Sequence, residues 1–214
     1  NNPHILGTER IGKLLVQYSI PAIISMTIVS LYNIIDSIFI GHGVGPMAIA
    51  GLAITFPLMN LTAAFCNLVS AGGSTISSIR LGQKDMEGVN KVLGNTLMLC
   101  LINAVVFGGL TFIFLDAILR FFGASGETLP YARDFMQVIL LGTPITFTMI
   151  GLNHVMRATG HPKKAMLTSL TTVVCNIILA PIFIFQFGWG IRGAALATVI
   201  SQFIGMLWVL NHFL

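Results

Sequence analysis

Residues 21–51 read PAIISMTIVSLYNIIDSIFIGHGVGPMAIAG, an apolar run long enough to cross a bilayer as a helix. Within this run lies one carboxylate, Asp36. A carboxylate at the centre of a membrane helix costs roughly 2.5 to 3.5 kcal/mol on insertion scales, so such a residue normally faces a cavity or a partner rather than lipid. We therefore predict that Asp36 faces the interior of a helix bundle, either as a transport group or bonded to a neighbouring helix.

Polar residues accompany Asp36 on one helical face. Ser25, Val29, Tyr32 and Asp36 recur at helical spacing, and Asn33 flanks this face. Because lipid does not favour polar groups, we predict that the face lines the protein interior. Further uncharged candidates for a substrate cavity lie in later apolar runs: Asn153, Asn176 and Gln202. Each can also be a packing residue, bonded to a neighbouring helix at a typical gain of about 0.6 kcal/mol.

The composition indicates an all-α protein that crosses the membrane several times. Hydrophobic residues make up 55% of the chain and charged residues only 8%, against roughly 25% charged in soluble domains. The mean hydropathy of +0.90 agrees. The net charge of +4 does not point to a nucleic-acid partner, because the cations lie in short connections between apolar runs. The expected surroundings are the lipid bilayer.

The alternation of apolar runs and short connections predicts a single domain over residues 1–214 with six membrane spans. The predicted spans are residues 14–40, 48–79, 92–115, 131–156, 166–187 and 193–213. Because the chain begins with Asn1 and stops inside an apolar run, we expect it to be part of a longer protein.

The distribution of cations predicts the orientation of these spans. Three arginines lie in connections on one side of the predicted membrane: Arg120, Arg133 and Arg192. The other eight cations lie on the opposite side: Arg10, Lys13, Arg80, Lys84, Lys91, Arg157, Lys163 and Lys164. Since the cytoplasmic side is the richer in Lys and Arg, both termini should be cytoplasmic, with Asp36 in the outward half of the first span.

Prolines indicate a bundle that changes shape. Pro21, Pro57, Pro144 and Pro181 lie inside or at the ends of four different spans, and each removes a helix hydrogen bond and permits a bend. A static kink that helps packing is the alternative at any one of them.

Enzyme and metal sites are not indicated. The interiors of the predicted spans offer Asp36 no second carboxylate, as an intramembrane aspartyl protease would require. His42 and His154 form no H-x-x-x-H or H-E-x-x-H grouping, and the three cysteines have no metal-ligand spacing. We expect no catalytic residues and no cofactor.

An ordered set of motifs resembles the multidrug and toxic compound extrusion (MATE) transporters. Pro21 followed fifteen positions later by Asp36, and then GHGVGPMAIAGL from Gly41, resembles the first helix and outer turn of that family. The segment LGQKD at residues 81–85 and RATGHPK at 157–163 resemble its cytoplasmic loops. NIILAP at residues 176–181 and GIRGAALAT at 190–198 resemble its fifth and sixth helices.

The resemblance implies a fold of two six-helix lobes, of which this chain matches the N-terminal one, with a second lobe in the parent chain as its partner. It also implies export of organic cations and amphipathic drugs across the bacterial cytoplasmic (inner) membrane, driven by inward flow of H⁺ or Na⁺. Matched by position, the cation site comprises Asp36, Asn176 and Thr198, and Pro21 is the residue at which the first helix bends. One departure is Ala180, which stands where many relatives have an aspartate.

These residues together lead us to expect alternating access, with a proton or a sodium ion binding at Asp36. A flippase for lipid-linked oligosaccharides, from the same superfamily, is an alternative. Such flippases tend to have cationic residues in the cavity, and the interiors of the predicted spans have none. A membrane scaffold subunit that transports nothing, with a structural Asp36, is another alternative.

Overall fold

The computed structural model describes residues 11–213, and within that range the chain is helical with no β-strand. The elements are α2 (Ile11–Gly43), α3 (Pro46–Gly82), α4 (Met86–Ile113), α5 (Leu115–Phe121), α6 (Leu129–Leu141), α7 (Thr143–Ala158), α8 (Pro162–Pro181), the π-helical turn η1 (Ile182–Gln186) and α9 (Gly190–Phe213). The all-α prediction is confirmed. Glu9 and Arg10, which belong to the polar N-terminal segment, lie outside the described residues.

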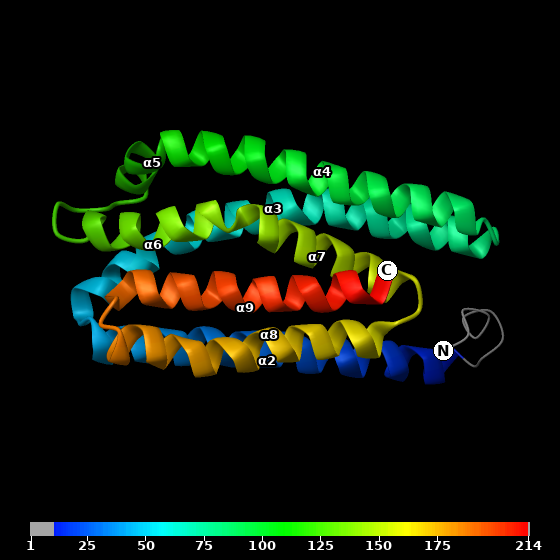
Figure 1. Cartoon of the computed structure of the whole chain (residues 1–214), viewed down its shortest axis with the longest axis horizontal. Coiled ribbons are helices and arrows are strands. Elements are labelled where there is room, and N and C mark those ends of the chain that lie inside the picture. The colour runs from blue at the N-terminus through cyan, green and yellow to red at the C-terminus, as the bar shows by residue number, and fades with distance from the viewer. Residues whose placement is uncertain (1–10, 214) are drawn as a thin grey trace.

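The long helices lie side by side and reverse direction at two ends of the molecule (Figure 1). The α2–α3, α5–α6 and η1–α9 connections lie at one end, and the α3–α4 and α7–α8 connections lie at the other. Five helices in the described range are long and apolar enough to cross a membrane, and α6 with α7 makes a sixth if the two form one bent span. The prediction of a polytopic membrane bundle is confirmed.

The fourth predicted span, residues 131–156, is not one straight helix. It divides into α6 and α7, whose axes differ by 57°. The break falls at Gly142, and Pro144 lies in the first turn of α7, where its missing N–H leaves no helix hydrogen bond unmade. Glycine followed closely by proline is therefore the physical cause of this bend.

The short helix α5 was not expected from the sequence, which suggested only a connection after residue 115. Seven residues form it, and its Leu115 and Leu119 are buried. Their spacing of four places both side chains on one face, which packs into the same apolar cluster as Phe135 and Met136 of α6. A helix of two turns is too short to leave a clear periodic pattern in the sequence.

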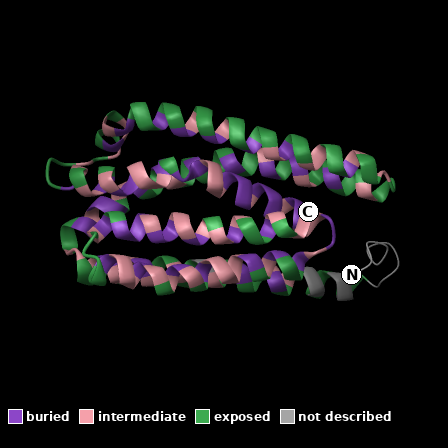
Figure 2. Ribbon diagram, in the orientation of Figure 1, coloured by how far each residue is buried: buried purple, intermediate pink, exposed green. Residues whose placement is uncertain are grey.

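Burial follows the inward faces of the bundle (Figure 2). Helix α4 illustrates the pattern, because its buried residues are mostly small and recur at helical spacing: Val89, Thr96, Cys100, Ala104, Gly108 and Thr111. The outer face of α4 exposes large apolar side chains such as Met98, Ile102 and Val105. In a membrane, this exposed apolar surface contacts lipid, and the small residues allow close approach of α3 and α7.

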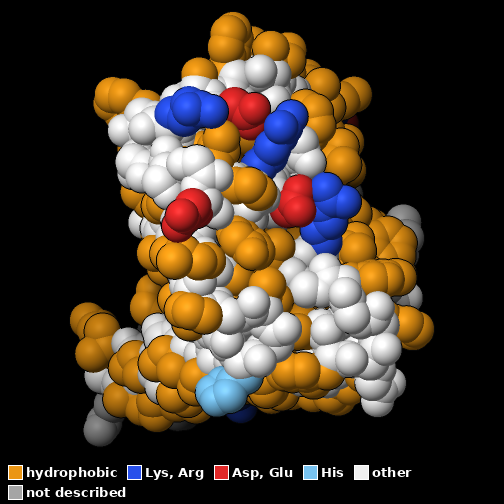
Figure 3. All heavy atoms as spheres, turned by 90° about the vertical axis from the view of Figure 1, so that its left-hand side faces the viewer, with side chains coloured by type: hydrophobic (Ala, Val, Ile, Leu, Met, Phe, Trp, Pro, Cys, Tyr) orange, Lys and Arg blue, Asp and Glu red, His pale blue; other side chains and the backbone are white. Residues whose placement is uncertain are grey.

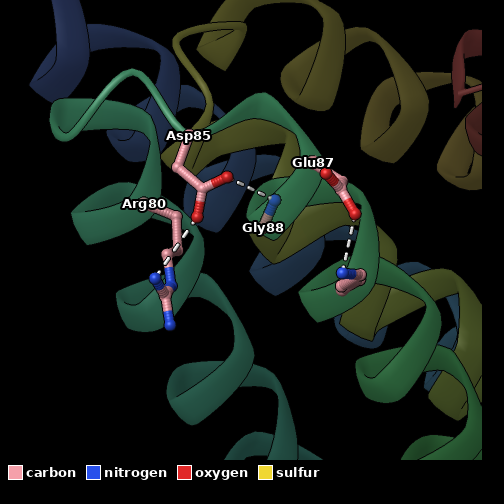
Figure 4. Close-up of polar contacts among 5 residues, drawn as sticks. Arg80, Asp85, Glu87 and Gly88 are labelled. Atoms are coloured by element: carbon pink, nitrogen blue, oxygen red, sulfur yellow. Dashed lines mark hydrogen bonds and ion pairs between the residues drawn. The ribbon is translucent and has the colours of Figure 1, made fainter.

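The α3–α4 turn is fixed by local polar contacts (Figure 4). Asp85 caps α4 by accepting a hydrogen bond of 2.8 Å from the Gly88 backbone N–H. Arg80 Nη1 lies 3.2 Å from the same carboxylate. Lys91 pairs with Glu87 one turn into α4, at 2.7 Å. An N-cap and an acidic residue in the first turn both favour a helix start at this position.

Helix α2 packs chiefly on α8 and has much less contact with α3. The turn between α2 and α3 is tight, because Gly45 adopts a left-handed backbone with φ of 115° and Pro46 follows at the first position of α3. Below this turn the two helices separate and leave a groove of about 620 Å³ between them. The first span therefore has one packed face and one open face.

Candidate functional site

Asp36 lies on the packed face of α2, and only 7% of its surface is exposed. It lines a cavity of about 20 Å³ between α2, α3, α6 and α9. The other lining residues are Tyr32, Asn33, Ser37, Leu52, Phe56, Met59, Phe135 and Thr198. A cavity of this size is on the scale of one water molecule. It fits an ion or a water molecule and excludes a drug molecule.

Three neutral polar side chains from three helices meet beside this cavity, and two of them, Tyr32 and Thr198, line it. Asn176 of α8 donates a hydrogen bond of 3.0 Å to the Thr198 hydroxyl of α9. The Tyr32 hydroxyl of α2 also lies 3.0 Å from the Thr198 hydroxyl oxygen. The Thr198 hydroxyl donates to the Ala194 carbonyl, so its oxygen accepts from both Asn176 and Tyr32. This network, which we call the polar triad, ties α2 to α8 and α9 beside Asp36.

A close approach between α8, η1 and α9 brings Asn176 and Thr198 into contact. A Cβ atom at Gly193 would lie 2.9 Å from both the carbonyl carbon and the carbonyl oxygen of Phe183, closer than real Cβ atoms come. Glycine is therefore required at this crossing. Thr198 lies five residues further along α9, where the helix still runs beside α8.

The Asp36 carboxylate differs from the polar triad because its Oδ1 atom has no hydrogen-bond partner among the described residues. Buried polar atoms in proteins are nearly always hydrogen-bonded, and an unpaired one calls for an explanation. Neither Lys nor Arg lines the cavity. The arrangement is thus a buried acid beside neutral oxygen and amide groups, which suits a group that binds a proton or a small cation.

The groove between α2 and α3 lies next to this cavity. Its residues are Asn33, Ile34, Ser37, Ile38, Gly41, His42, Pro46, Ile49 and Phe56. Asn33, Ser37 and Phe56 line both the groove and the Asp36 cavity. Most of the groove surface is apolar, and at about 620 Å³ it falls within the usual size range of small-molecule sites. An ion-sized cavity and a ligand-sized groove thus share part of one wall.

The remaining candidates from the sequence lie elsewhere. Asn153 on α7 is buried and donates to the Ala165 carbonyl of α8 at 3.1 Å. Gln202 on α9 is bonded to the Thr146 hydroxyl of α7. Neither lines the Asp36 cavity or the groove. Pro21 lies inside α2, and its carbonyl accepts a hydrogen bond of 2.8 Å from the Ser25 hydroxyl.

Comparison with known protein families identifies the chain. The family model for MatE matches residues 21–182, which include Asp36, Tyr32 and Asn176. The chain belongs to the MATE family.

Relatives of this MATE chain agree in sequence and in fold. The multidrug export protein MepA of Staphylococcus haemolyticus (strain JCSC1435) is 34% identical over 95% of the chain. A structure of the MATE multidrug transporter DinF-BH is 39% identical over 97% of the chain, with a TM-score of 0.91. A crystal structure of MATE in the straight conformation covers the whole chain at 30% identity, with a TM-score of 0.90.

The MATE chain spans about half the length of these relatives. It covers 45% of the staphylococcal MepA and 47% of each of the two solved chains. A single lobe of a two-lobe transporter matches this coverage.

Sequence reasoning missed the apolar part of the Asp36 cavity. Phe135 of α6 and the α3 residues Leu52, Phe56 and Met59 complete the cavity wall. These residues are ordinary apolar positions in long apolar runs, so no local signal distinguishes them. Ala180 is fully buried and packs in the main apolar cluster, one turn after Asn176 on α8. Asp36 is thus the only carboxylate that lines the described cavity.

Proposed function

We propose that this chain is the N-terminal lobe of a bacterial exporter that moves organic cations and other amphipathic drugs out across the cytoplasmic membrane. Family membership and the multidrug relatives support this proposal. The observation on which it chiefly depends is the buried Asp36 carboxylate, whose Oδ1 has no hydrogen-bond partner among the described residues. The Asp36 cavity lies beside a ligand-sized apolar groove. A protein that exchanges a drug for a cation requires such neighbouring sites.

The coupling ion is a proton or a sodium ion that binds at Asp36. A proton would neutralise the buried acid and supply a donor. A sodium ion would find a hard oxygen ligand in the Asp36 carboxylate, and the Thr198 hydroxyl and the Asn176 amide carbonyl would become further oxygen ligands once the hydrogen bonds of the polar triad rearrange. Either ion leaves the carboxylate charge-balanced, and a cationic drug in the adjacent groove competes for the same negative charge.

Transport then follows from movement of α2. Pro21 precedes Asp36 by fifteen residues, or about 22 Å along a helix. A small bend at Pro21 would therefore displace Asp36 by a large distance. Helix α2 packs mainly on α8, and its bonds to the rest of the site pass through Tyr32. Binding or release of the ion at Asp36 changes the electrostatic cost of keeping α2 in this position, and alternating access results when the helix shifts in response.

The flippase alternative predicts a cavity for an anionic, lipid-linked sugar. The lining residues of the Asp36 cavity and of the groove include no Lys or Arg. A site with one carboxylate and neutral polar groups favours cationic or neutral substrates over anionic ones. The second lobe of the parent chain is expected to supply the other wall of the substrate path.

Drug export is tested with the complete protein in cells that lack their own exporters. Cells that make it should accumulate less of a fluorescent organic cation such as ethidium, and collapse of the proton and sodium gradients should abolish the difference. Equal accumulation with and without the protein, at verified membrane levels, would favour the scaffold alternative.

The orientation of the lobe gives a separate prediction. Lys84 lies in the α3–α4 connection and Lys163 in the first turn of α8, both at one end of the bundle, and Gly126 lies in the α5–α6 connection at the other end (Figure 1). We expect reporters attached at Lys84 or Lys163 to be cytoplasmic and one at Gly126 to be on the outer side. The opposite labelling would place Asp36 in the cytoplasmic half of the membrane instead of the outer half.

A further inference from the structure

Three arginines from three helices surround one cavity at the end of the bundle that holds the α5–α6 connection. Arg120 of α5, Arg133 of α6 and Arg192 of α9 line a space of about 440 Å³ together with Gly126, Leu129, Pro130, Asp134 and Gln137. Figure 3 views this end and shows its charged side chains gathered on one part of a largely apolar surface. We call this cavity the arginine pocket.

Three acidic residues, Asp116, Glu127 and Asp134, lie at the same end as the three arginines, and they pair with two of them. Arg133 Nε lies 3.3 Å from Asp116, and Arg192 Nη2 lies 2.8 Å from Asp134. Arg120 has no acidic partner within 4.0 Å among residues 11–213. Asp134 is the single carboxylate among the lining residues, although Glu127 directly follows the lining residue Gly126, so the pocket concentrates guanidinium groups rather than net charge. Each guanidinium has five N–H donors, and the two ion pairs leave most of those donors free for a ligand.

The depth of the pocket in the membrane indicates where a ligand would come from. Arg120 lies in the last turn of α5, and Arg133 and Arg192 lie near the starts of α6 and α9, so all three are at helix ends. The same end exposes aromatic side chains, with Trp189 50% exposed and Phe121 84% exposed. Exposed tryptophan at the end of a membrane span is typical of headgroup depth. Lipid phosphates lie at that depth.

We propose that the arginine pocket binds the phosphate of an anionic lipid headgroup from the leaflet at this end of the bundle. Guanidinium groups converging from three elements match the geometry of a phosphate, whose oxygens accept several charge-assisted hydrogen bonds at once. A bound phosphate bridges α5, α6 and α9, two of which contribute Phe135 and Thr198 to the Asp36 cavity. The lipid thereby stabilises the α6 and α9 wall of the Asp36 cavity without entering that cavity. This role rests on the proposed function.

The test is a lipid titration of the purified complete protein by native mass spectrometry. Phosphatidylglycerol is the probe, phosphatidylcholine is the zwitterionic comparison and inorganic phosphate is the soluble competitor. Arg120→Gln should weaken phosphatidylglycerol binding about fivefold, the effect of one basic residue near an anionic lipid. Asp134→Asn should strengthen binding, because it removes the only negative charge on the wall and frees Arg192. Lys163→Gln, an exposed cation at the opposite end, should leave binding unchanged.

Opposite changes in Arg120→Gln and Asp134→Asn support the proposal, since a general loss of folding would weaken binding in both. Equal losses in Arg120→Gln and Lys163→Gln would overturn it, because they would reflect net charge alone. Equal binding of phosphatidylcholine would also overturn it, as would unchanged binding in Arg120→Gln. Displacement of the lipid by millimolar inorganic phosphate would assign the pocket to a soluble phosphate instead.

Discussion

Replacement of Asp36 by asparagine should lower drug efflux by the complete protein more than tenfold while leaving its amount in the membrane nearly normal. Asparagine keeps the shape of the side chain and its capacity to hydrogen-bond, but it neither titrates nor balances a cation. No other carboxylate lines the described cavity, so no neighbour can replace the lost charge. The measurement is efflux of a fluorescent cationic dye from cells at matched protein levels.

A second carboxylate variant serves as the control for Asp36→Asn. Glu87→Gln makes the equivalent chemical change at a side chain that is 80% exposed and paired with Lys91 in the first turn of α4. Exposed pairs of this kind contribute only about 0.3 to 0.5 kcal/mol, so efflux should be unaffected. Equal efflux by wild type and Asp36→Asn would show that Asp36 is structural.

The second large effect is expected at Gly193, where α9 packs against the backbone of η1. An alanine Cβ there would lie 2.9 Å from the backbone carbonyl of Phe183, which cannot move away as a flexible side chain can. Overpacking of this kind costs about 1 to 3 kcal/mol. We expect Gly193→Ala to lower the apparent melting temperature of the complete protein by roughly 1 to 6 °C.

Gly94→Ala is the matched control for Gly193→Ala. Gly94 also lies inside a helix, α4, but a Cβ there would meet no atom within 4 Å. Alanine favours a helix over glycine by up to about 1 kcal/mol, so this variant should be as stable as wild type or more stable. A melting temperature of Gly193→Ala at or above that of Gly94→Ala would contradict the close contact between Gly193 of α9 and the Phe183 backbone of η1.

The sequence predicted the helices better than the way they pack. The cost of a carboxylate in lipid was enough to predict a buried Asp36, and the structure leaves it 7% exposed. Gly142 and Pro144 mark the break in the fourth span, although the 57° angle depends on how α6 and α7 pack on their neighbours. Helix α5 was missed because two leucines on two turns give no distinct pattern.

Of the residues around the Asp36 cavity, the sequence pointed only to polar ones. Asn176 and Thr198 were chosen from the family resemblance, and their 3.0 Å contact depends on the α8–α9 crossing, which helical spacing cannot encode. Phe135 and Phe56 come from distant parts of the chain and resemble any other apolar residue of their helices. Asn153 and Gln202 look equally polar in sequence, but in the fold their side chains bond to α8 and α7 away from Asp36.

The most direct test of Asp36 as the coupling group uses the complete protein reconstituted in liposomes. A proton gradient and a sodium gradient are imposed separately, and counter-transport of a cationic dye is measured for wild type and for Asp36→Asn. We predict that one of the two gradients accelerates dye movement by wild type, and that neither gradient changes the residual rate of Asp36→Asn. Dye movement by Asp36→Asn that still responds to an imposed gradient as wild type does would contradict the account.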